Sequence, residues 1–187
     1  MRKLILLFAV ISLISCKSRT GYIDAEAPDN VLAYEPFKLI LEKDYNIVEL
    51  NPAKPIKVGD NTMHHNIYRV RIPKKLVNWT IKGRKYIFEY DDREIIAIDG
   101  GYANSPRNEA WELRDSLDYG ILKPYIHNYA KEQSYGDNYL EDYLKNIPEG
   151  RVTKMYSNHA TRVLLFNIKE KNFEDYLNLI KTIEYIE

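Results

Sequence analysis

Two adjacent histidines, His64 and His65, are the residues whose type and position best suit metal chemistry. Imidazole nitrogens are common zinc ligands, and Asp60 is close enough in the sequence to supply a third ligand. Successive side chains of a strand point to opposite faces, so the pair could share a metal only from an irregular loop. Two interpretations stay open: a polar loop before a strand, or the metal site of a hydrolase.

Asp99 could belong to such a hydrolase site, because it ends an expected strand and is followed by Gly100-Gly101. Loops after strands often carry binding or catalytic residues, and two glycines let the backbone approach a ligand or adopt a positive φ. The alternative is a flexible exit from the sheet.

A run of tyrosines in the second half of the chain forms another group of candidates: Tyr119, Tyr125, Tyr129, Tyr135, Tyr139 and Tyr143. At helical spacing, Tyr125 and Tyr129 share one face, and Tyr139 and Tyr143 share another. Tyrosine has an apolar ring and a polar tip, and it is favoured at protein interfaces and sugar-stacking surfaces. We therefore predict that these six tyrosines bind a partner. The alternative is that their rings pack helices onto a sheet.

The sequence contains none of the common catalytic or nucleotide-binding motifs: no P-loop, Gly-rich dinucleotide turn, G-x-S-x-G elbow, H-E-x-x-H or EF-hand loop. The 27 basic residues balance 27 acidic residues, which argues against a nucleic-acid binder held by a basic field. We expect no cofactor and no nucleic-acid partner, and we favour a binding protein over an enzyme.

The first residues have the pattern of an export signal. Arg2 and Lys3 are positive, and residues 4–15 carry no charge. A bilayer span needs about 20 apolar residues, so this stretch is too short for a mature transmembrane helix. It matches a secretory signal peptide instead. Cys16 follows it and is the only cysteine, which excludes a disulfide framework and a thiolate zinc site.

The run ends in Leu13-Ile14-Ser15-Cys16, which resembles the lipobox of bacterial lipoproteins. The resemblance implies that the Cys16 sulfur receives a diacylglycerol, that residues 1–15 are removed as a signal peptide, and that the new N-terminus is usually acylated. The membrane is then a partner through the N-terminal lipid. The alternatives are an ordinary signal peptide with an incidental cysteine, or an uncleaved anchor.

Lys17-Ser18 follows the cysteine where lipoproteins carry sorting signals. The Asp that retains enterobacterial lipoproteins in the inner membrane is absent. The acidic residues associated with surface display in Bacteroidota are absent too. The analogy predicts an outer-membrane protein that faces the periplasm, if the host is Gram-negative.

Residues 16–32 are polar, contain Gly21 and Pro28, and show no hydrophobic period. They are predicted to be the lipidated N-terminus and a flexible tether. No internal repeat follows, so residues 33–187 are predicted to form a single domain.

Apolar residues that alternate with polar ones predict strands over 66–72, 79–82, 84–90 and 93–99, the last three as an antiparallel meander. Gly83 and Asp91-Asp92 supply its turns. Residues 151–156 and 161–168 predict a hairpin. The segment 163–166 is apolar on both faces, which predicts a central strand covered on both sides.

Three helices are expected. Ser105-Pro106 is a typical start for a helix over about 105–117. Asn138, with Glu141 three residues later, resembles the capping box of a second helix. A C-terminal helix begins near Asn172, and its 3.6-residue apolar period extends to Ile183.

These elements predict an α+β fold: an antiparallel sheet of about five to seven strands covered by helices, with a C-terminal strand followed by an amphipathic helix. Ile72-Pro73, Trp79, the Tyr-Phe hairpin and the terminal strand and helix together look like the PsbP/DcrB-like fold of small envelope lipoproteins. The resemblance covers residues 65–99 and 150–187, and it implies an accessory or binding protein.

We therefore expect a lipid-anchored, non-catalytic protein of the cell envelope that binds a protein partner, as accessory and immunity-type lipoproteins do. One alternative is an envelope hydrolase with a loop site near His64, His65 and Asp99. Another is a glycan-binding module that uses the tyrosine-rich helical segment.

Overall fold

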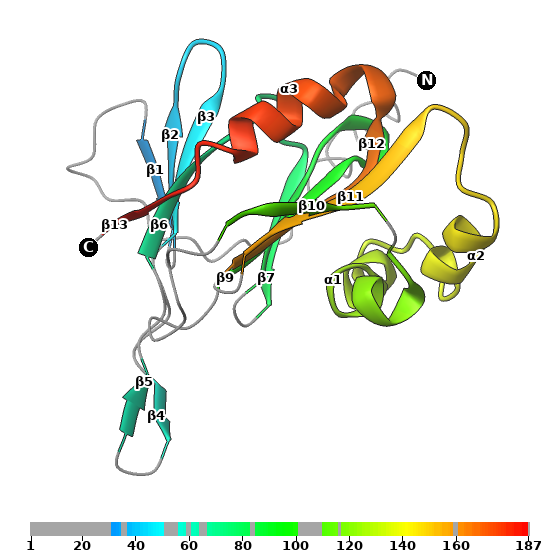
Figure 1. Cartoon of the computed structure of the whole chain (residues 1–187), viewed down its shortest axis with the longest axis horizontal. Coiled ribbons are helices and arrows are strands. Elements are labelled where there is room, and N and C mark those ends of the chain that lie inside the picture. Colours follow the sequence, from blue (N-terminus) through cyan, green and yellow to red (C-terminus); the bar gives the residue numbers. More distant parts are fainter. Residues whose placement is uncertain are drawn as a thin grey trace, which may run out of the picture.

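The computed structural model describes residues 31–34, 37–50, 56–58, 61–63, 67–82, 85–100, 110–115, 117–158 and 161–186. These residues form two large antiparallel sheets, a small hairpin and three α-helices (Figure 1). The hairpin consists of β4 (Ile56–Val58) and β5 (Asn61–Met63).

The first sheet has five strands in the order β1 (Val31–Tyr34), β2 (Phe37–Leu41), β3 (Asn46–Leu50), β6 (Ile67–Ile72) and β13 (Glu184–Ile186). In β2 and β3, buried residues alternate with more exposed ones. This is the pattern of strands that bury one face only.

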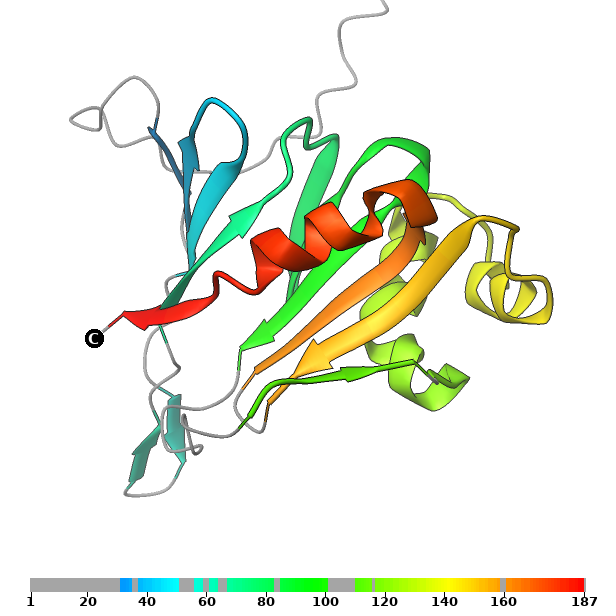
Figure 2. The same ribbon diagram turned by 45° about the horizontal axis from the view of Figure 1, so that its top comes forward.

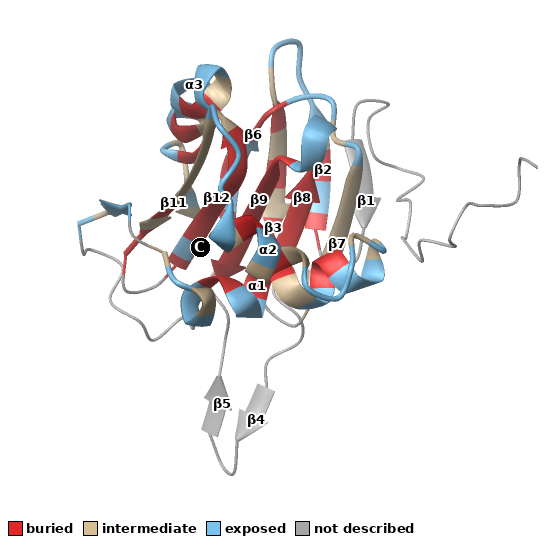
Figure 3. Cartoon of the chain, turned by 90° about the vertical axis from the view of Figure 1, so that its right-hand side faces the viewer, coloured by how far each residue is buried: buried red, intermediate tan, exposed pale blue. Residues whose placement is uncertain are grey.

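The second sheet has six strands in the order β10 (Glu112–Arg114), β11 (Arg151–Ser157), β12 (Thr161–Lys169), β9 (Ile95–Gly100), β8 (Lys85–Glu89) and β7 (Asn78–Lys82). Its strands β8, β9 and β12 are buried on both faces, whereas β11 is mostly half-buried, as Figure 3 shows. Val163 and Leu165 of β12 belong to one core cluster, and Leu164 and Phe166 belong to another. The predicted central strand, covered on both sides, is therefore confirmed.

The first core cluster lies between the two sheets. It joins Phe37, Val48 and Tyr68 of the first sheet to Phe88 and Ile98 of the second. The helix α3 (Glu170–Ile180) adds Phe173, Leu177 and Ile180 to the same cluster. It packs on β6, β11 and β12, so it spans both sheets, as Figure 2 shows.

The second core cluster lies on the opposite face of the six-stranded sheet. There α1 (Tyr119–Glu132) and α2 (Tyr139–Lys145) cover Ile87, Ala97 and Leu164. The α1 residues that face the sheet recur at helical spacing, and the Asp118 side chain caps the helix by accepting from the backbone N–H of Ile121 at 2.9 Å. The result is three layers: a five-stranded sheet, a six-stranded sheet and a pair of helices.

The predicted α+β class is confirmed, including the C-terminal strand followed by an amphipathic helix. The meander β7-β8-β9 and the hairpin β11-β12 are also as predicted. The strands are divided between two sheets, and β6 belongs to the first of them.

Three local predictions were wrong. Residues 112–114, expected within a helix, form the edge strand β10 because they pair with β11. Asn138 precedes α2 but makes no capping hydrogen bond through its side chain. The C-terminal helix ends at Ile180, and the chain returns to the first sheet as β13. Ser105-Pro106 lies outside the described residues.

Candidate functional site

A row of polar side chains crosses the helix-bearing face of the six-stranded sheet. Glu112 lies opposite Ser157, Ser157 opposite Arg162, Arg162 opposite Asp99, and Asp99 opposite Lys85. Residues directly opposite on paired strands share a face, so five neighbouring strands contribute to one row. The adjacent row includes Met155, Leu164, Ala97 and Ile87, which are the apolar residues that α1 and α2 cover.

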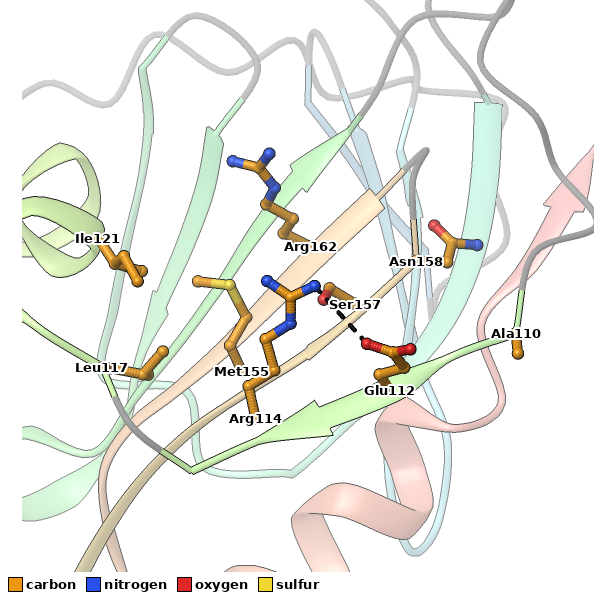
Figure 4. A pocket seen from close by; sticks show the side chains of 9 residues that line it. All are labelled: Ala110, Glu112, Arg114, Leu117, Ile121, Met155, Ser157, Asn158 and Arg162. Atoms are coloured by element: carbon orange, nitrogen blue, oxygen red, sulfur yellow. Dashed lines mark ion pairs between the residues drawn. The ribbon is translucent and has the colours of Figure 1, made fainter.

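The polar row borders a cavity of about 500 Å³, which we call the sheet cavity. It is lined by Ala110, Glu112, Arg114, Leu117, Ile121, Met155, Ser157, Asn158 and Arg162. Figure 4 shows that strands β10, β11 and β12 supply its polar groups, while Leu117 and Ile121 stand at the other side. The strands therefore supply the charged groups of the cavity together with the apolar Met155, and the side near α1 is apolar.

The charged groups of the sheet cavity are weakly paired. Arg114 Nη2 lies 3.6 Å from Glu112 Oε2, and both side chains are mostly exposed. The hydroxyl of Tyr125 lies beside Arg162, and it donates a hydrogen bond to Asp99 Oδ2 at 3.4 Å. Burial, reinforced by the Asp99 carboxylate, raises the pKa of Tyr125 to about 12. The hydroxyl thus keeps its proton at neutral pH.

A second, open cavity of about 450 Å³ lies where α2 meets the turn at Asp92 and the end of β12 at Asn167, and we call it the loop cavity. It is lined by Asp92, Arg93, Tyr139, Asp142, Tyr143, Pro148, Arg151 and Asn167. The Arg93 guanidinium lies over the Tyr135 ring at 4.4 Å and over the Tyr139 ring at 5.5 Å. Such contacts fix the orientation of both partners.

Three non-glycine residues at the loop cavity have positive φ angles: Asp92 at 58°, Arg93 at 61° and Asn167 at 55°. Side chains with a Cβ rarely adopt this conformation unless surrounding contacts hold it. Here Asn167 Nδ2 donates to the carbonyl oxygens of Asp92 and Arg93, each at 3.1 Å. Arg151 Nη1 in turn donates to the Asn167 carbonyl at 2.9 Å.

The structure separates the six candidate tyrosines into two groups. Tyr125, Tyr129 and Tyr143 are buried and pack the helices onto the sheet, so their predicted place at a partner surface is corrected. Their spacing along the helices is that of a core-facing stripe, which explains the burial. Tyr119, Tyr135 and Tyr139 are half-buried and remain partly accessible.

Two of these tyrosines bind a buried carboxylate. Glu89, at the end of β8, is 5% exposed and accepts hydrogen bonds from the hydroxyls of Tyr129 and Tyr135. Burial and the nearby Glu89 raise the pKa values of both tyrosines. The contact attaches the turn between α1 and α2 to the sheet, and it leaves the Tyr135 ring beside Arg93.

Several of the other sequence candidates belong to parts of the chain that the structure does not describe. Cys16, His64 and His65 lie outside the described residues. Gly100 does not make room for a ligand: a Cβ there would lie 2.9 Å from the Tyr68 hydroxyl oxygen, so the missing side chain accommodates the ring of Tyr68. Within the described ranges, no group of three or more His, Cys, Asp or Glu residues is placed to hold a metal ion.

None of the described helices is long and apolar enough to span a membrane. Comparisons with known proteins give no match to a family model, a curated protein or a solved structure. The resemblances to lipoproteins and to the PsbP/DcrB-like fold stay predictions.

The arginines that line the two cavities were not among the site residues predicted from the sequence. Arg93 and Arg151 are separated in the chain by β9, β10, α1 and α2, and Arg114 belongs to β10, which the sequence predicted as part of a helix. The one available signal was Arg162, a charge that precedes an apolar run.

Proposed function

We propose that the chain is a lipid-anchored, non-catalytic protein of the cell envelope that binds a protein partner. The lipid is attached at Cys16, and the partner binds the surface around the loop cavity, at Arg93, Tyr135 and Tyr139. The observation that carries the proposal is the position of the Arg93 guanidinium over two half-buried tyrosine rings beside that cavity.

Tyrosine and arginine are the residue types that most often dominate binding at protein interfaces. Arg93 is exposed, whereas Tyr135 and Tyr139 are half-buried, so their rings and the guanidinium form one composite surface. Interior residues hold this surface in place. The Tyr135 hydroxyl donates a hydrogen bond to Glu89, and the Tyr139 ring packs on the Phe166 ring with a centroid distance of 6.3 Å.

The backbone below the surface is held in advance of binding. Asn167 bonds to both Asp92 and Arg93, and Lys169 forms an ion pair with Asp92. A surface that is already ordered loses less conformational entropy on association, which favours affinity.

Charges around the loop cavity have both signs: Arg93 and Arg151 are basic, and Asp92 and Asp142 are acidic. A mixed polar rim around aromatic side chains is typical of a protein interface, and it does not favour a uniformly charged polymer. The partner is therefore expected to carry both acidic and basic groups at the contact.

Attachment to the membrane requires nothing from the folded domain. Each buried acyl methylene contributes about 0.8 kcal/mol, and two or more acyl chains give stable anchoring. The segment before β1, residues 16–30, then connects the lipid to the domain and lets the loop cavity reach a neighbouring envelope protein. It is two residues shorter than the predicted tether because Val31 and Leu32 pair with β2.

Co-purification of matched variants tests the partner surface. Asp142 is exposed and forms an ion pair with the exposed Lys145, so Asp142→Lys reverses a charge at the cavity without removing a buried contact. Asp175→Lys makes the same change on an exposed position of α3.

We expect the wild type and Asp175→Lys, solubilised from the membranes of the native host, to recover the same envelope protein in stoichiometric amount. Asp142→Lys should lose it. The proposal fails if the wild type is recovered alone in several mild detergents, or if Asp142→Lys retains the partner as well as Asp175→Lys does.

A further inference from the structure

The sheet cavity is distinct from the surface proposed for the protein partner. The two cavities lie at opposite ends of the β11-β12 hairpin: Ser157 and Arg162 line the sheet cavity, whereas Arg151 and Asn167 line the loop cavity. A volume of about 500 Å³ is typical of small-molecule sites. The residues that line the cavity determine which class of small molecule it can bind.

Ser157 is a polar residue in the floor of the sheet cavity. Its side chain is on the face that carries Met155 and Arg162, and the residue is 7% exposed. A serine hydroxyl can both donate and accept a hydrogen bond, so it suits a polar group of a ligand in the cavity.

Two guanidinium groups face the same space. Figure 4 shows Arg114 beside Ser157, with Arg162 on the same side of the sheet. Arg114 Nη2 lies 3.6 Å from Glu112 Oε2, and both side chains are exposed. Ion pairs between exposed side chains contribute little to stability. Arg114 can therefore exchange Glu112 for a ligand. The planar fork of arginine matches a carboxylate or a phosphate better than any other side chain does.

The rest of the lining is apolar. Met155 is 4% exposed and lies in the floor, and Leu117 and Ile121 form the side near the start of α1. Ile121 is one of the large apolar residues that remain exposed in this structure. A ligand with an apolar body would cover these side chains while its charged group meets the arginines.

We propose that the sheet cavity binds a small molecule that carries an oxyanion, either a carboxylate or a phosphate, on an apolar body. Arg114 and Arg162 bind the oxyanion, the Ser157 hydroxyl donates a hydrogen bond to it, and Met155, Leu117 and Ile121 contact the apolar body. Glu112 competes with the ligand for Arg114. This site does not depend on the partner surface or on lipidation.

Three probes of similar shape test the proposal: 2-naphthoate, 2-naphthyl phosphate and the uncharged 2-naphthamide. Each is titrated by calorimetry into the full-length chain held in lipid nanodiscs, and empty nanodiscs correct for partition into lipid. We expect one or both anions to bind at least tenfold more tightly than 2-naphthamide. Preference for the carboxylate or for the phosphate identifies the source of the oxyanion.

Variants locate the binding. Arg114→Gln and Arg162→Gln should each weaken the better anion about tenfold or more, because each removes a charged hydrogen bond. Ser157→Ala should weaken it less, and Glu112→Gln should strengthen it. Arg71→Gln removes a positive charge from an exposed position of β6 in the other sheet, where Arg71 lies over the Tyr45 ring, and should leave binding unchanged.

The proposal is overturned by any of three results: no anion binds at millimolar concentration, 2-naphthamide binds as tightly as the anions, or Arg114→Gln and Arg162→Gln both bind like Arg71→Gln. Circular dichroism of each variant confirms that it is folded. None of these results bears on the partner surface, which the co-purification tests separately.

Discussion

The Glu94 carboxylate accepts a hydrogen bond from the backbone N–H of Lys169 at 2.7 Å, which places a buried acid at the amino end of α3. Glu94 is 2% exposed, and it also accepts from Asn172 Nδ2 at 3.0 Å and from the Tyr176 hydroxyl at 3.1 Å. Lys169 provides no capping side chain of its own. Glu94 therefore provides a hydrogen-bond acceptor at the start of α3 from another part of the chain. Its negative charge is also favourable next to the positive end of the helix dipole.

Replacing Glu94 by Gln should lower the free energy of unfolding by about 2 kcal/mol, because all its partners are donors and an amide nitrogen cannot accept from them. Urea unfolding at neutral pH measures the change. Glu174→Gln alters an exposed carboxylate on the same helix and serves as the control. Equal stabilities for the two variants would contradict this role of Glu94.

Gly100→Ala should destabilise the protein by about 1–3 kcal/mol, because the new Cβ would lie 2.9 Å from the Tyr68 hydroxyl oxygen and 3.0 Å from its Cε1. Removing the hydroxyl with Tyr68→Phe should recover part of the loss. A double-mutant cycle of unfolding free energies measures this coupling. Strict additivity of the two substitutions would show that Gly100 and Tyr68 are not in close contact.

Stability should fall at alkaline pH. Burial raises the pKa of Tyr86 and of Tyr125 from the ordinary value of 10.0 to about 12. An unfolded chain then loses these protons at a lower pH than the folded chain does. Their stabilising contribution is complete below pH 10 and is lost as the pH rises toward 12. Each of the two tyrosines lowers the free energy of unfolding by about 1.4 kcal/mol per pH unit within that window.

Tyrosinate absorbance and unfolding free energy, both followed from pH 9 upward, measure this dependence. The buried Tyr86 and Tyr125 should ionise only together with the loss of structure. A free energy of unfolding that stays constant from pH 10 to pH 12 would contradict the burial of Tyr86 and Tyr125.

Much of the fold could be predicted because local patterns and tertiary pairing agree. The apolar run 163–166 indicated a strand with two buried faces, and the structure confirms it. Where tertiary pairing decides, the prediction was wrong. Ala110, Leu113 and Leu117 have a spacing that suits a helix, yet Leu113 pairs with Tyr156 across two strands. The alternation in β3 was a usable signal for a strand that we did not predict.

The sites were harder to predict than the fold. Arg114 and Arg162 meet at one cavity only because β10, β11 and β12 pair in one particular register, which the sequence does not display. The tyrosines were a visible feature, but burial separates Tyr129 from Tyr139, and helical spacing alone cannot tell a core stripe from a surface stripe.

Incorporation of labelled palmitate in the native host is the most direct test of the lipid-anchored envelope protein proposed above. The Cys16 thiol is the only acceptor for the diacylglycerol, since the chain has a single cysteine. The wild type should therefore incorporate label and fractionate with membranes. Cys16→Ser should remain an unlabelled precursor with its signal peptide, while Ser18→Ala, two residues later, should behave as the wild type. A wild type without label, or a Cys16→Ser variant with as much label as the wild type, would contradict the lipid anchor and the envelope location that rests on it.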